Sequence, residues 1–387
     1  MRETCTDISR SKVLLLESKK IRLIEPVVGA EEEKLIGEVL RSGWLTEGPM
    51  ARRFEDLFKA FVGAKHAITA SSCTTAIEMG LRAMGIGPGD EVIVPDFTHP
   101  ATADAVIAFG AHPVLVDVSL SSYNLDFNEA EKAVTKKTRA AIPVSWGGYP
   151  LNDKELKDLK DEHDVLMLED AACSPGAEYN GAKTGVMADI TAFSFHPRKS
   201  ITTGEGGMIT TESDDYAEKI RSLKNFGVGK VGTESHFIRY GSNYKMSDIL
   251  AAMGVAQMGK LAKIVERRIE LAENYNKLLS EVKGIKPPQK EKGIKHIYQT
   301  YAVYLEVEGA RNRLIADLKK IGIETQIGTY ALHLEPYFSS LKKQGDLHRS
   351  KLLYENLLAL PMCHTMTKAD QEYVVSQIEK HLQNYQR

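Results

Sequence analysis

Short apolar segments alternate with amphipathic segments from residue 31 to residue 195, and this alternation limits the fold more than any other feature. The apolar and β-branched runs predict strands at residues 66–70, 91–95, 113–118, 140–145, 165–169 and 190–195. Helical spacing predicts helices at residues 31–41, 51–62, 74–83, 102–109, 128–134 and 153–162. Strands and helices that alternate in this way form a mostly parallel sheet covered by helices on both faces. The sequence therefore predicts an α/β fold.

The rest of the chain predicts a second, smaller unit. One more strand is expected at 208–211, and Ser247 caps a long helix that is expected to reach about residue 282. The lysine-rich and proline-containing segment 283–295 marks a boundary. We then expect a strand at 300–305 and helices at 310–321, 348–358 and 368–381, which make a compact α+β domain. The predicted organisation is a polar leader (1–24), a large domain that includes the long helix (25–282) and a small C-terminal domain (283–387).

Composition excludes several classes of function. The formal net charge is -2, so nothing favours a nucleic acid as partner. The four cysteines are too few for a disulfide scaffold and lack metal-ligand spacing, which favours a reducing, cytoplasmic setting and no metal. The apolar patch at 13–16 is too short for a signal peptide, and no apolar run reaches the length of a membrane span.

Chemistry-bearing residues follow four of the predicted strands, where ligands bind in a parallel α/β sheet. The segment 71–75 (SSCTT) offers free N–H groups and hydroxyls to a phosphate, although simple helix capping explains it too. His99, after Pro95, could cover one face of a flat ring or lie on the surface. These two junctions alone decide nothing.

The other two junctions are more distinctive. Glu169 and Asp170 follow a strongly apolar strand, and buried carboxylates there need partners. The pyridine nitrogen of pyridoxal 5'-phosphate (PLP) is such a partner; a cap or a metal ligand are the alternatives. Lys199 lies in a glycine-containing loop after the strand 190–195, where partial burial and Arg198 could lower its pKa, or where it could simply be solvated. Together the four junctions supply the parts that a PLP site requires.

Several ordered motifs resemble the DegT/DnrJ/StrS family of sugar aminotransferases, which are fold-type-I PLP enzymes. The resemblance runs from about residue 21 to the C-terminus. The motifs are 194–207 (SFHPRKSITTGEGG), 43–49 (GWLTEGP), 89–95 (GDEVIVP), 169–172 (EDAA) and 243–248 (NYKMSD).

The resemblance implies a role for each matching residue. Lys199 would carry PLP as a Schiff base and then move the proton, and Asp170 would pair with the pyridine nitrogen. The residues implied in phosphate binding are Cys73, Thr74 and Ser194, with Asn243 from the neighbouring subunit of a homodimer. His99 and Cys173 would lie at the cofactor ring, although Cys173 replaces the Gln or His of many relatives. On the substrate side, the resemblance points to His333, Tyr330 and Thr46.

The lysine at position 199 separates two reactions within this family. Relatives that dehydrate a sugar have His there, so Lys199 favours transamination, with an amino acid, glutamate, as donor and a nucleotide-linked keto-sugar as acceptor. A sugar dehydratase or a non-catalytic regulator on the same fold is the alternative. A dinucleotide-binding site is disfavoured because the glycines at 85–89 precede a strand, and a P-loop because Lys224 stands where its first glycine belongs. The carbon that is aminated, and whether a cyclitol replaces the sugar, stay open.

Overall fold

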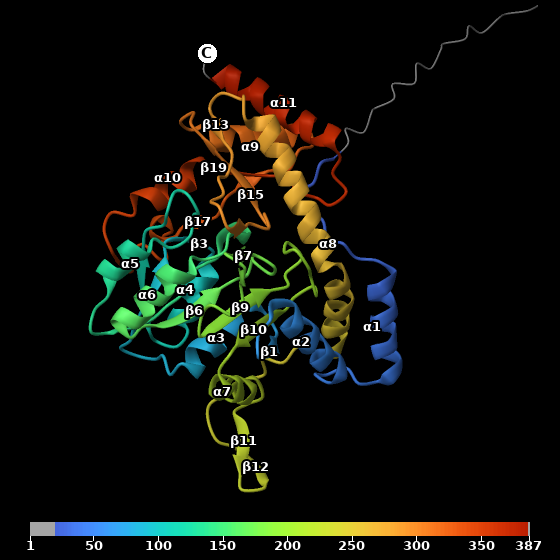
Figure 1. Ribbon diagram of the computed structural model, residues 1–387, viewed down its shortest axis with the longest axis vertical. Helices are drawn as coiled ribbons and strands as arrows, with labels where there is room; N and C mark the ends of the chain where they lie inside the picture. Colours follow the sequence, from blue (N-terminus) through green and yellow to red (C-terminus); the bar gives the residue numbers. More distant parts are fainter. Residues whose placement is uncertain (1–19, 386–387) are drawn as a thin grey trace, which may run out of the picture.

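A computed structural model describes residues 20–385, and an eight-stranded sheet forms its centre (Figure 1). In spatial order the strands are β1 (His66–Ala70), β10 (Gly207–Thr211), β9 (Ile190–Ser194), β6 (Leu166–Asp170), β5 (Thr138–Ala141), β2 (Glu91–Pro95), β4 (His112–Val116) and β18 (Lys342–Lys343). Only β10 runs antiparallel to its neighbours. The mostly parallel sheet of an α/β fold is therefore confirmed.

Helices bury both faces of this sheet. The helices α3 (Cys73–Ala83), α4 (Pro100–Ile107) and α7 (Asp214–Lys224) pack on one face, against side chains such as Leu168 and Ala192. The other face is covered by α2 (Pro49–Val62), α5 (Phe127–Ala133), α6 (Asp153–His163) and the first half of α8 (Asp248–Leu279), with α1 (Ala30–Ser42) packed on α8. Successive strand residues face opposite layers, so neighbours in one strand reach different environments.

A four-stranded antiparallel sheet organises the C-terminal part. Its order is β13 (Ile285–Lys286), β15 (Tyr301–Leu305), β19 (Leu357–Leu360) and β16 (Gln326–Ile327). The helices α9 (Ala310–Lys320) and α11 (Lys368–Tyr385), with the C-terminal half of α8, share one apolar core with it. In Figure 1 this unit lies above the large sheet, and α8 runs from one to the other.

Two segments cross the boundaries expected from the sequence. Ile21 is buried in the core of the C-terminal unit and pairs with Ile323, so the described part of the expected leader, from residue 20, packs there. The rest of the leader lies outside the described residues. The strand β18 belongs by position to the small domain, yet it joins the large sheet beside β4. The domain boundaries at 24 and 282 therefore stay predictions.

The sequence did not predict a β-hairpin, β11 (Val228–Val231) and β12 (Glu234–Phe237), that follows α7. In Figure 1 it projects away from the rest of the molecule. Its tip residues are exposed, and the Phe237 side chain is 77% exposed. No helix among the described residues is long and apolar enough to cross a membrane.

Candidate active site

The carboxyl ends of β1, β6 and β9 meet at one edge of the sheet. Ser194, the last residue of β9, pairs with Gly207, which pairs with Ala70 at the end of β1. Asp170, the last residue of β6, pairs with Ala192, two residues before Ser194. The predicted junctions after these three strands are therefore brought together.

The N-terminus of α3 forms the first wall of this site. Ser72 is the N-cap, and its hydroxyl accepts a hydrogen bond from the backbone N–H of Thr75 at 3.1 Å. Helix geometry leaves the N–H groups of Cys73 and Thr74 without carbonyl partners inside the helix, so they can bind a phosphate. Gly207 of β10 can pack closely against this wall because it has no side chain. A Cβ atom at position 207 would lie 2.4 Å from the Ser72 carbonyl oxygen. The capping of α3 by Ser72 therefore leaves this helix end able to bind an anion.

Asp170 is held by a helix that the sequence did not connect with it. The Thr102 hydroxyl, in α4, donates to Asp170 Oδ2 at 2.8 Å, and the backbone N–H of Ala172 donates to Oδ1 at 3.1 Å. Asp170 is only 6% exposed and shares the sheet face that α3 and α4 cover. An ionised carboxylate fixed in this way can stabilise a protonated ring nitrogen.

Lys199 lies in the turn after β9, and its side chain reaches Cys173 in the turn after β6. Its Nζ donates to Cys173 Sγ at 3.2 Å. Burial lowers the pKa of Lys199, but Cys173, Cys73 and Asp170 raise it, and the net direction is upward. The expectation of a lowered pKa from partial burial and Arg198 was wrong, because Asp170 and the sulfur atoms of Cys173 and Cys73 lie near the amine, while Arg198 is exposed to solvent. The amine therefore lies among acceptors, close to Asp170.

Glu169, the neighbour of Asp170, serves the opposite face of the sheet. It is fully buried and accepts hydrogen bonds from the hydroxyls of Ser145 and, at 3.4 Å, Thr191. Burial raises the pKa of Glu169 to about 7. Of the two adjacent carboxylates, only Asp170 belongs to the site edge described above.

The substrate-side residues of the C-terminal part are joined to the large sheet. The short strands β17 (Tyr330–Ala331) and β3 (Phe97–Thr98) pair, and the ring of Tyr330 meets that of His99 edge-on at 6.4 Å between centroids. Burial, and then the charge of Lys199, lowers the pKa of His99, so its ring is neutral at pH 7. A neutral ring at this position could cover a flat cofactor.

His333 is held by a carboxylate that the sequence analysis had not selected. Its Nδ1 lies 2.6 Å from Asp96 Oδ2, and its backbone N–H donates to Asp96 Oδ1 at 2.8 Å. Asp96 is fully buried at the end of β2. Because Nδ1 is bound to Asp96, only Nε2 of His333 can contact a substrate. The predicted role of His333 in substrate binding is therefore limited to this one nitrogen.

Two further predicted residues lie at the edge of this region. Asn243 is exposed and bridges to Asn225, while the next residue, Tyr244, accepts the backbone N–H of Ser71 beside the phosphate-binding turn. Thr46 is exposed, and its carbonyl oxygen accepts the N–H of Asp248 at the start of α8. The Lys199 amine donates to Cys173 and to neither of these side chains, so their roles stay predictions.

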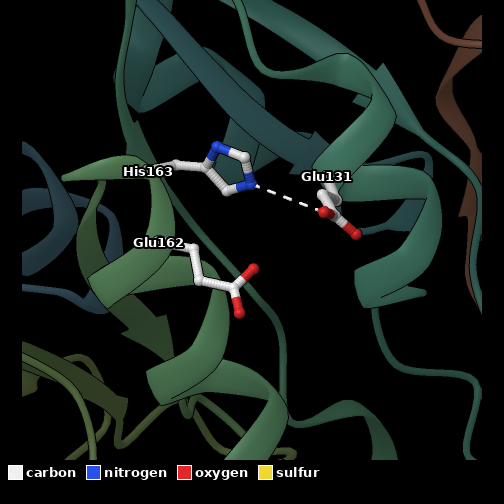
Figure 2. A group of neighbouring side chains, drawn as sticks. All are labelled: Glu131, Glu162 and His163. Atoms are coloured by element: carbon white, nitrogen blue, oxygen red, sulfur yellow. Dashed lines mark ion pairs between the residues drawn. The ribbon is translucent and has the colours of Figure 1, made fainter.

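One group of side chains among residues 20–385 could hold a metal ion: Glu131, Glu162 and His163 (Figure 2). His163 Nε2 lies 3.7 Å from Glu131, and both glutamates are exposed. His163 ends α6, at the opposite end of β6 from Asp170. This group therefore belongs to the surface and not to the site.

The residues of the site fit PLP. A phosphate matches the free N–H groups of α3, a pyridine nitrogen matches Asp170, and an aldehyde matches the amine of Lys199. Thr102 is the site residue that sequence reasoning missed. A threonine in a predicted helix after His99 was visible, but nothing local shows that it faces Asp170.

Comparison with known proteins gives the same answer. Residues 26–379 match the DegT/DnrJ/EryC1/StrS aminotransferase family. The GDP-perosamine synthase of Caulobacter vibrioides is 34% identical over 93% of this chain and 98% of its own length. The UDP-4-amino-4-deoxy-L-arabinose–oxoglutarate aminotransferase of Shewanella sediminis is 32% identical over 94% and 99%.

A Streptococcus pneumoniae protein solved in its PLP form superposes with a TM-score of 0.89 at 25% identity, over 95% of this chain and 99% of that one. The predicted fold type, cofactor and enzyme class are thus confirmed. The chain belongs to the DegT/DnrJ/EryC1/StrS family and is a PLP-dependent aminotransferase.

Proposed function

We propose that the protein transfers an amino group from an amino acid, glutamate, to a nucleotide-linked keto-sugar. The observation that carries the proposal is the convergence of the Lys199 amine, the Asp170 carboxylate and the N-terminus of α3 at one sheet edge. Two relatives, a GDP-perosamine synthase and a UDP-sugar–oxoglutarate aminotransferase, support this choice of acceptor and donor class by their names.

Each residue would have a distinct task. PLP, when bound, supplies an electron sink that stabilises negative charge on the amino-acid carbon. Lys199 would hold the cofactor by its Nζ and, once released, its free amine would take the proton from the donor carbon and give it back, as the base and then the acid of the 1,3-proton shift. Asp170 keeps the ring nitrogen protonated, and the Thr102 hydroxyl fixes which carboxylate oxygen faces the ring. Cys73, Thr74 and Ser194 would bind the phosphate.

Lysine at position 199 also argues against the dehydratase alternative. A proton-shuttling amine that can return to the cofactor suits amine transfer, in which the cofactor is regenerated each cycle. The buried, hydrogen-bonded Asp170 argues against a regulator that has lost its chemistry, because an unused carboxylate at 6% exposure would only cost stability.

The proposal includes a homodimer that shares its active sites. Asn243 would reach the phosphate in the neighbouring subunit. Its exposure, and its place at the base of the projecting hairpin with the exposed Phe237, support a role between subunits.

Separate half-reactions test the donor and the acceptor. Glutamate should bleach the visible absorbance of the PLP-loaded protein. A panel of nucleotide-linked 3-keto and 4-keto hexoses and cyclitol ketones is then offered, and one nucleotide-linked hexose should restore the band. The matched control, Lys199→Ala, should show neither change. Failure of glutamate to bleach the band, or restoration by a cyclitol ketone alone, would contradict the proposal.

A further inference from the structure

The contact between Lys199 and Cys173 is not explained by the roles assigned so far. The Nζ of Lys199 donates to Cys173 Sγ at 3.2 Å, which is within hydrogen-bonding reach for sulfur. Within residues 20–385 this Nζ makes no other hydrogen bond, and Asp170 acts on it only through its charge. Cys173 is therefore the direct partner of the amine.

The backbone around Cys173 is held in place by buried contacts. The Ser174 hydroxyl donates to the Ser145 carbonyl at 2.7 Å, and the Ser174 N–H donates to the Ala171 carbonyl at 2.9 Å. Gly148, with a φ of +95°, approaches so closely that a Cβ atom there would lie 3.2 Å from the Cys173 carbonyl oxygen. The Cα atom of Cys173, from which the sulfur extends by one rotatable bond, thus has a fixed position.

The backbone around Lys199 is fixed in the same manner. The Lys199 N–H donates to the His196 carbonyl at 2.8 Å, and the Gln299 side chain donates to the Arg198 carbonyl at 2.7 Å. Between these anchors only the side chain of Lys199 is free to rotate, and a lysine side chain has large rotamer entropy. A hydrogen-bond partner for the Nζ atom therefore selects one orientation of the Lys199 side chain.

During each catalytic cycle the amine must leave the cofactor and come back. We propose that Cys173 is a positioning residue whose sulfur holds the Lys199 amine whenever that amine is not bonded to the cofactor. The proposal rests on the proposed role of Lys199 as the PLP-binding lysine. The partly exposed sulfur lies within reach of the amine and at the same sheet edge as Asp170, so the held amine stays beside the site it must re-enter.

The rate at which PLP-free enzyme captures PLP tests this proposal. Added PLP is followed by the growth of the visible band of lysine-bound PLP, for the wild type and for three variants at position 173. Cys173→Ala removes the acceptor, Cys173→Val removes it while filling the space, and Cys173→Ser keeps an acceptor. Because a hydrogen bond to a charged amine is lost, we expect Ala and Val to slow capture about tenfold, while Ser stays near the wild-type rate.

A control and a second readout separate anchoring from general damage. Cys363→Ala removes a thiol in the C-terminal core and should capture PLP at the wild-type rate. Thermal unfolding of the PLP-free variants reports whether position 173 also matters for folding. Capture by Cys173→Val as fast as the wild type, or by Cys173→Ser as slow as Val, would overturn the proposal. Absence of a visible band in the wild type would instead overturn the assignment of Lys199.

Discussion

At the scale of single residues, Glu169 and Asp170 differ in environment although they are neighbours in one strand. Asp170 faces the site and is bound by Thr102, whereas Glu169 faces the opposite layer, where the hydroxyls of Ser145 and Thr191 and the backbone of Gly185 are its partners. Since adjacent strand residues point to opposite faces, one carboxylate can be placed for chemistry while the other is buried. Burial raises the pKa of Glu169 to about 7, against 4.5 for an ordinary glutamate.

The raised pKa of Glu169 predicts that stability falls as the pH rises. The folded protein keeps a proton that the unfolded chain releases, so this contribution is fully present below pH 4.5 and is lost as the pH rises through 7. The loss is about 3 kcal/mol of unfolding free energy. Glu169→Gln stays neutral and should lack this dependence. Urea unfolding at pH 5 to 8 measures it, and parallel curves for wild type and variant would contradict the prediction.

At the scale of elements, the sequence predicted those whose apolar side chains face a core. The strands β1 and β2 match the predicted ranges, and α8 begins after the predicted cap Ser247, whose side chain accepts the Leu250 N–H. Helix α7 also has the sequence features of a helix, since Ser213 caps it and Ile220 and Leu223 form part of its buried face. This helix is nevertheless absent from those predicted above.

Two elements differ from what their local sequence patterns predict. Residues 357–360 continue the apolar spacing of the preceding helix, so they were expected to be helical up to 358. They form β19 instead, because a fully buried strand is needed between β15 and β16. The hairpin β11–β12 has exposed side chains and therefore lacks the alternation that reveals a half-buried strand.

Only part of the candidate site could be predicted from the sequence. Lys199 and Asp170 could be found because each follows a strand, and the ends of parallel strands meet. Thr102 and Asp96 act through contacts with Asp170 and His333, which are distant in sequence. Only the packing of α4 and of the β17 segment on the large sheet brings these pairs together.

For the whole molecule, the proposed sharing of active sites in a homodimer predicts complementation between subunits. Lys199→Ala and Asn243→Asp should each be inactive alone, the second because its charge repels the phosphate. In an equimolar mixture of refolded subunits, half of the dimers combine both variants, and each of these has one intact site. We expect about a quarter of the wild-type activity. No gain on mixing would show that Asn243 acts within its own subunit.

The central claim, that Lys199 binds the cofactor, can be tested directly. The PLP-loaded protein is reduced with borohydride and digested, and the peptides are analysed by mass spectrometry. We expect loss of the visible band and a phosphopyridoxyl group on Lys199 alone, with none recovered from Lys199→Ala. A phosphopyridoxyl group on another lysine, or on no lysine, would contradict the assignment of Lys199.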